Sequence, residues 1–218
     1  MSGPPESVDT ALTTQRPGLV SPFESTATTD GAAVADLVRR ARAGEDAAFE
    51  TLVVAFERRV LRTALRLLGR PDLAEDAAQE TFLRLHRYLH SYDPARDLGP
   101  WLYRVVVNVC RDLGRRSRRG LAVPLEDERL EGRGEMQVDG AAIERQAGLE
   151  WERRLLGAAL ASLPEKERAA IVLRDIEGLA TREVARILGS SEGTVRSQIS
   201  TGRMKLRRFV EQRLEKRP

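Results

Sequence analysis

The stretch TREVARILGSSEGTVRSQISTGRMKL, residues 181–206, decides the fold of the C-terminal part of the chain. Apolar residues recur at helical spacing in its first segment, and Val184 and Ile187 share one face. Gly189 supplies the left-handed conformation that ends a helix, and Ser191 can cap the next helix by accepting from its free N–H groups. The spacing therefore predicts two helices that meet at a short corner.

The second of these helices has one apolar face and one polar face. Val195, Ile199 and Leu206 lie inside, and the outward residues are Glu192, Thr194, Arg196, Ser197, Gln198 and Thr201. A small residue, a Gly four later and an aliphatic residue six after that is the spacing of a helix-turn-helix, whose second helix enters the DNA major groove. A plain helical hairpin is the alternative, but it requires neither the spacing nor the polar face.

Working outward, charge is segregated along the 218 residues, although the net charge is only +3. Residues 203–217 hold seven basic and two acidic side chains, 111–119 are rich in Arg, and 126–150 hold eight acidic and three basic ones. Such a pattern suits a protein that meets DNA at two places. With 32% charged and 41% apolar residues, the chain has the balance of a globular protein with room for two small domains.

Several classes of function are disfavoured by composition. Cys110 is the single cysteine, which excludes an internal disulfide, and we expect it in the core. His86 and His90 are four apart without further ligands, so no metal and no cofactor are expected. The sequence offers no Ser/His/Asp set or phosphate-cradling Gly loop, which argues against an enzyme. No membrane span or secretion signal is predicted, and we expect a cytoplasmic protein.

The N-terminal half is predicted to begin with a disordered tail at residues 1–31, followed by helices at 36–43 and 47–68. Pro71 opens a third helix that runs to about residue 89. Its exposed side is acidic for two turns, longer than a helix-dipole preference explains, and we interpret it as a partner surface. The residues of this acidic face are Asp72, Glu75, Asp76, Gln79 and Glu80.

A loop at residues 91–100 and a fourth helix from Trp101 follow. Asn108 interrupts an apolar run, and it either satisfies an internal hydrogen bond or reads a base. Trp101 and Tyr103 either stack on unpaired bases or belong to the core. Residues 120–148 are predicted to be a flexible acidic linker, after which Trp151 begins the apolar pattern of a second helical domain. The fold class is therefore all-α, with two small domains at residues 32–119 and 149–218.

Three motifs in this order resemble the extracytoplasmic function (ECF) sigma factors of bacterial RNA polymerase, in the sigma-70 family. They are DLAEDAAQETFLRLHR (72–87), WLYRVVVNVCRDLGRR (101–116) and LPEKERAAIVLRDIEGLATREVARILGSSEGTVRSQISTGRMKLRR (163–208). The resemblance covers residues 33–119 and 149–210. It implies a sigma-two domain, which binds polymerase and melts the minus-ten element, and a sigma-four domain, which reads the minus-thirty-five element.

The resemblance also implies partners and sites. The acidic face would dock on the clamp helices of the largest polymerase subunit, and the second largest would offer its flap. An anti-sigma factor is a further possible partner. Contacts to melted minus-ten DNA would come from Asp93, Arg96, Trp101, Arg104, Asn108, Arg111, Arg115 and Arg116. Contacts to duplex minus-thirty-five DNA would come from Ser191, Glu192, Thr194, Arg196, Ser197, Gln198, Thr201 and Arg203.

The sequence departs from the family pattern in the helix-turn-helix, mainly in its second helix. Gln198 and Thr201 stand where Arg is common, and Gly202 lies inside the helix at a typical cost of about 1 kcal/mol. Ala180 replaces a frequent capping Ser, which leaves Thr181 as the expected cap. These departures bear on promoter preference. The rival interpretation is a stand-alone helix-turn-helix regulator that binds duplex DNA without recruiting polymerase.

Overall fold

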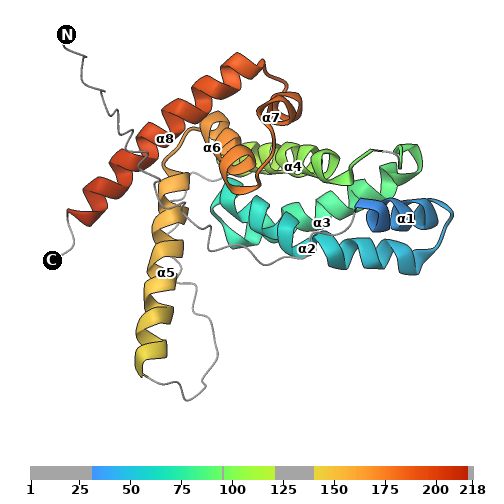
Figure 1. Ribbon diagram of the computed structural model, residues 1–218, viewed down its shortest axis with the longest axis horizontal. Coiled ribbons are helices and arrows are strands. Elements are labelled where there is room, and N and C mark those ends of the chain that lie inside the picture. Colours follow the sequence, from blue (N-terminus) through green and yellow to red (C-terminus); the bar gives the residue numbers. More distant parts are fainter. Residues whose placement is uncertain (1–30, 95, 121–139, 216–218) are drawn as a thin grey trace, which may run out of the picture.

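The computed structural model describes residues 31–94, 96–120 and 140–215, and every regular element within them is a helix (Figure 1). The all-α prediction is thereby confirmed. The predicted tail and the linker segment 121–139 lie outside the described residues.

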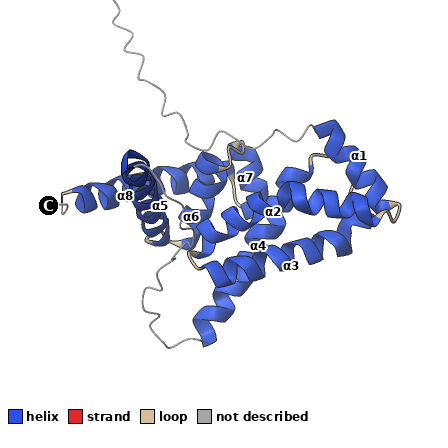
Figure 2. Ribbon diagram, turned by 90° about the horizontal axis from the view of Figure 1, so that it is seen from below, coloured by secondary structure: helices blue, strands red, loops and turns tan. Residues whose placement is uncertain are grey.

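The N-terminal module consists of α1 (Gly31–Arg42), α2 (Asp46–Leu68), α3 (Pro71–Tyr88), a short 3₁₀ turn (Leu89–Ser91) and α4 (Leu98–Gly120). Figure 2 shows α2, α3 and α4 side by side, and α1 packs against α2. Gly44 and Gly69 follow α1 and α2 at φ values of 92° and 71°, which favour glycine. Both helices therefore end within one residue of the predicted ends at 43 and 68. The module closes around Leu52, Leu85 and Val106, which are at most 1% exposed.

Two boundaries in this module differ from the sequence prediction. The first helix begins at Gly31, five residues early, and α4 begins at Leu98, three residues before Trp101. The carboxylate of Asp97 accepts the N–H of Gly99 at 2.9 Å and so caps α4, while Pro100 falls in the first turn, where its missing N–H has no helical partner to lose. The Gly-Pro pair therefore opens a helix here instead of marking a loop.

The C-terminal module consists of α5 (Gly140–Ala161), α6 (Glu165–Ile171), a π-helical turn (Val172–Ile176), α7 (Thr181–Leu188) and α8 (Glu192–Leu214). In Figure 1, α5 extends away from the other helices. Its start at Gly140 shows that residues 140–148 are helical, so the linker prediction was too long. Trp151, which we expected to be apolar core, is exposed, because it lies on the part of α5 that extends outward.

The fourth helix, α4, is buried on two faces. Val106 and Val109 belong to the core of the N-terminal module, whereas Tyr103 and Val107 pack into the C-terminal core together with Val184. Periodicity within a helix cannot show that a second module covers its other side. The two modules therefore pack against each other along α4, with α7 in contact with it.

Candidate polymerase and nucleic-acid interfaces

The acidic face lies on α3, opposite the side that is buried through Ala77 and Leu85. Arg70 hydrogen-bonds Asp72 and thereby lowers the pKa of that carboxyl group. Arg84 donates to Glu80 at 2.7 Å, and Glu80 is half-buried. The remaining members of the face, Glu75, Asp76 and Gln79, are exposed and form no ion pair or side-chain hydrogen bond within the described residues.

The loop before α4 is held by its own hydrogen bonds. Tyr92 donates from its hydroxyl to the carbonyl of Arg96 at 2.9 Å and packs edge-to-face on Trp101, with ring centroids 5.5 Å apart. Burial, followed by the nearby charges of Asp97 and Asp93, raises the pKa of Tyr92 to about 12, so it remains a donor at neutral pH. Trp101 is half-buried against the core of its module, which leaves only part of its ring for a base.

The predicted minus-ten residues on α4 do not all share one environment. Arg104, Arg115 and Arg116 are exposed, whereas Arg111 lies 3.3 Å from Glu165 of the C-terminal module. Asn108 is half-buried, and its amide has no hydrogen-bond partner within the described part of the chain. The internal hydrogen bond, one of the two roles expected for Asn108, is therefore absent there.

The helix-turn-helix has the predicted geometry. Gly189 adopts a φ of 62° after α7, and Ser191 caps α8 by accepting the N–H of Thr194 at 3.1 Å. The expected cap of α7 was wrong: Thr181 is already helical, Ala180 is the cap residue, and the carboxylate of Glu183 accepts its N–H at 2.9 Å.

Six of the eight residues predicted to contact minus-thirty-five DNA are exposed. They are Ser191, Glu192, Thr194, Arg196, Ser197 and Arg203. Glu192 accepts from Arg196 at 2.7 Å, and Asp175 accepts from Arg203 at 2.8 Å. Thr201 and Gln198 are half-buried, and the side-chain oxygen of Gln198 is buried without a hydrogen-bond partner. The expectation that Gln198 faces fully outward was therefore wrong for this arrangement.

One residue that sequence reasoning missed is Glu177, which lies just after the π-helical turn. Its side chain is 8% exposed, and its two oxygens accept hydrogen bonds from Thr63, Arg66 and Tyr103 of the N-terminal module. Arg168 also crosses between the modules and donates to the carbonyl of Leu67 at 2.7 Å. A Glu next to the helix-stopping Gly178 carries no local signal of burial, because the burial depends on the docking of two distant segments.

Comparisons with known proteins agree with this architecture. The family model Sigma-70 region 2 matches residues 52–120, and Sigma-70, region 4 matches residues 153–206. The ECF RNA polymerase sigma factor SigM of Mycobacterium tuberculosis (strain H37Rv) is 33% identical over 177 residues, which cover 81% of this chain and 84% of SigM. SigE of Mycolicibacterium smegmatis is 38% identical over 164 residues, 74% of this chain, but these span only 61% of SigE.

Solved structures show the same fold. The structure of CnrH in complex with the cytosolic domain of CnrY aligns with a TM-score of 0.60 at 26% identity, covering 81% of this chain and 96% of that one. The sigma factor RpoE, co-crystallised with the anti-sigma factor NepR from Bartonella quintana, aligns with a TM-score of 0.56 at 22% identity, covering 75% and 96%.

The two family models match one helical module each, and together they assign the chain to the transcription initiation factors. The chain belongs to the ECF sigma factors of the sigma-70 family and is an RNA polymerase sigma factor. Among the described residues, no group of three or more His, Cys, Asp or Glu side chains could hold a metal ion. None of the described helices is long and apolar enough to cross a membrane.

Proposed function

We propose that this sigma factor brings core RNA polymerase to promoters with both a minus-ten and a minus-thirty-five element and helps to open the DNA. The observation that carries the proposal is the presentation of α8. Its capped N-terminal end is exposed, and Arg196, with 67% of its side chain exposed, can reach a guanine edge or a phosphate. In this proposal, the C-terminal module, which contains most of the predicted domain at residues 149–218, reads intact duplex.

The N-terminal module, which contains the predicted domain at residues 32–119, is proposed to bind polymerase and the melted strand. Glu75, Asp76 and Gln79 offer unoccupied acceptors for the clamp helices of the largest subunit, and the flap of the second largest would meet the other module. The unsatisfied amide of Asn108, next to exposed Arg104, suits a base edge beside a phosphate. Unstacking a base costs a few kcal/mol per step, which such contacts would offset.

We further propose that an anti-sigma protein binds this chain in the cytoplasm. The support comes from similar proteins, since RpoE is crystallised with the anti-sigma factor NepR and CnrH with the cytosolic domain of CnrY. The rival proposal of a stand-alone regulator is weakened by the match of Sigma-70 region 2 to residues 52–120, which a helix-turn-helix regulator does not require.

Transcription in vitro with purified core polymerase and a library of promoter fragments tests the function. We expect initiation at a defined set of start sites that share sequence at two upstream positions. A matched reaction with an Arg196→Ala chain should lose preference at the upstream element while it still binds core polymerase. If the wild-type chain bound core polymerase yet initiated at no fragment, the proposal would be overturned.

A further inference from the structure

The contact between the modules has the form of an occupied anion site. Oε1 of Glu177 lies 2.9 Å from the hydroxyl of Thr63 and 2.8 Å from Nη1 of Arg66, and Oε2 lies 2.7 Å from the hydroxyl of Tyr103. Thr63 is also 2.8 Å from the carbonyl of Arg59, so its single proton is shared between two acceptors. The carboxylate of Glu177, from the C-terminal module, thus accepts hydrogen bonds from three side chains of the N-terminal module.

The three donors belong to the same module. Thr63 and Arg66 lie one turn apart on α2, Tyr103 lies on α4, and these two helices pack in the same N-terminal module. Burial and the charge of Glu177 both raise the pKa of Tyr103, so its hydroxyl keeps its proton and donates. If the C-terminal module moves away, the donors remain together. Two hydroxyl groups and a guanidinium are a donor set that binds phosphate oxygens.

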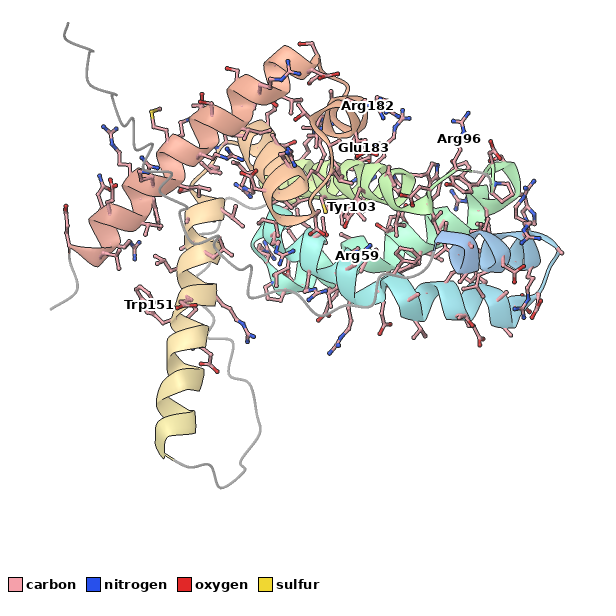
Figure 3. The ribbon with its side chains drawn as sticks, viewed as in Figure 1. Arg59, Arg96, Tyr103, Trp151, Arg182 and Glu183 are labelled. Carbon is pink, nitrogen blue, oxygen red and sulfur yellow. The ribbon has the colours of Figure 1, made fainter. Side chains whose placement is uncertain are left out.

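A cleft leads from this site to the loop before α4. Its volume is about 680 Å³, and it is lined by Glu177 and Tyr103 at one end and by Pro94 and Arg96 at the other. Arg59 and Arg62 also line it, and neither forms an ion pair within the described residues. Figure 3 shows Arg59 and Tyr103 at the junction of the modules and Arg96 farther along. The positive charge of these arginines therefore suits the phosphate backbone of a nucleic-acid strand.

We propose that Thr63, Arg66 and Tyr103 form a phosphate site for single-stranded promoter DNA, and that Glu177 occupies this site as an internal competitor when the modules are closed. The identity of the strand, the melted minus-ten strand, rests on the proposed function. Because one site cannot hold both anions, the strand and the C-terminal module exclude each other there. A strand that contacts Arg96 in the loop before α4 would run along the cleft past Arg59 and Arg62 and reach the site only after the modules part.

Binding of a mixed-sequence single-stranded oligonucleotide to the full chain, followed by fluorescence anisotropy, tests this proposal. Glu177→Gln removes the competing charge and should tighten binding about threefold or more, because a weakened closed state leaves a larger binding-competent fraction. Adding Tyr103→Phe should reverse most of this gain. Adding Arg66→Gln instead should reduce the salt slope by about 0.7, the value for one phosphate contact on a single strand.

Glu165→Gln is the matched control, since it removes the ion pair with Arg111 between the same modules without touching the site. Circular dichroism checks that every variant is folded. If Glu165→Gln tightened binding as much as Glu177→Gln, the loss of any carboxylate at the junction would explain the gain, and the phosphate site would be rejected. An unchanged affinity in Glu177→Gln, or a gain that survives Tyr103→Phe, would reject it as well.

The two proposals fail separately. A wild-type chain that initiates transcription while Glu177→Gln leaves oligonucleotide affinity unchanged would reject only the phosphate site. A chain that initiates nowhere would reject the sigma function, whatever the oligonucleotide assay gives.

Discussion

At the scale of single residues, Cys110 makes the burial of α4 measurable. The thiol is 4% exposed, and burial raises its pKa to about 12, so almost none of it is the reactive thiolate at neutral pH. We expect the native chain to react slowly with a thiol reagent such as dithiobis(2-nitrobenzoate), and the denatured chain to react at its one thiol. The absorbance of the released product measures both. Rapid reaction of the native chain would contradict the packing of α4.

Asn108 should matter for DNA but little for stability. Its amide has no hydrogen-bond partner within the described residues, so Asn108→Ala should change the free energy of unfolding by about 0.5 kcal/mol or less. We expect weaker use of minus-ten sequences with unchanged binding to duplex minus-thirty-five DNA. Reporter transcription from promoters altered at one element at a time separates the two effects. Equal losses at both elements would remove the proposed role.

Residue roles that depend on local chemistry could be predicted, and roles that depend on docking could not. Ser191 and Gly189 act as expected because a cap and a left-handed helix end are local events. The sequence did not place Glu177 and Arg111 at the contact between the modules, because the ion-pair partner of each lies in the other module. Gln198 was expected to face outward from helical spacing alone, yet the surrounding elements bury its oxygen.

At the scale of elements, the lack of a side chain at Gly202 lets α8 pack closely against α6. A Cβ at this position would lie 2.9 Å from Cγ1 of Ile171, which is itself 2% exposed and cannot move freely. Overpacking of about 1–3 kcal/mol outweighs the gain of about 1 kcal/mol in helix propensity, so Gly202→Ala should lower the free energy of unfolding by about 1 kcal/mol.

Gly193→Ala is the control for this prediction, because its Cβ would meet only the hydroxyl of Ser191 at 3.9 Å. It lies in the same helix and should raise stability by a few tenths of a kcal/mol. Thermal unfolding of the two variants beside the wild type compares them. A stabilised Gly202→Ala chain would show that α6 and α8 are not in close contact.

The acidic face of α3 gives an element-scale test of polymerase binding. Reversing charge at two of its positions, Asp76→Lys with Glu80→Lys, should weaken co-purification with core polymerase by tenfold or more, a loss of about 1.4 kcal/mol. Glu50→Lys is the matched control, since it is an exposed acid on α2 outside this face. Retention of core polymerase by the double variant would exclude the face as the docking surface.

Apolar periodicity in the sequence predicted which segments form helices, but it predicted the ends of these helices less well. Apolar spacing placed α2, α3, α7 and α8, since each buries one stripe. The start of α5 was missed because residues 140–148 lack an apolar period, so that nothing in their pattern separates a helix from a linker. The helix-turn-helix could therefore be predicted closely, and the length of the segment joining the modules could not.

At the scale of the whole molecule, the two modules have separate apolar cores, and α4 contributes residues to both. Tyr103 and Val107 are apolar partners of the C-terminal core, and the polar contacts of Glu177 and Arg168 surround them. The proposed function requires the two modules to contact separate promoter elements. Under that proposal, polymerase and promoter must displace the closed arrangement, because ligands that favour an open state shift the population toward it.

The balance between these states should depend unequally on the two acids at the junction. Glu177 is buried and accepts three hydrogen bonds, so Glu177→Ala should cost the closed state about 2–4 kcal/mol. Glu165, with 42% of its side chain exposed, forms an ion pair with Arg111 that contributes about 1 kcal/mol or less. X-ray scattering should therefore show a larger radius of gyration for Glu177→Ala, and a nearly unchanged one for Glu165→Ala. Equal expansion in both variants, or none in either, would mean that the carboxylate of Glu177 does not hold the modules together.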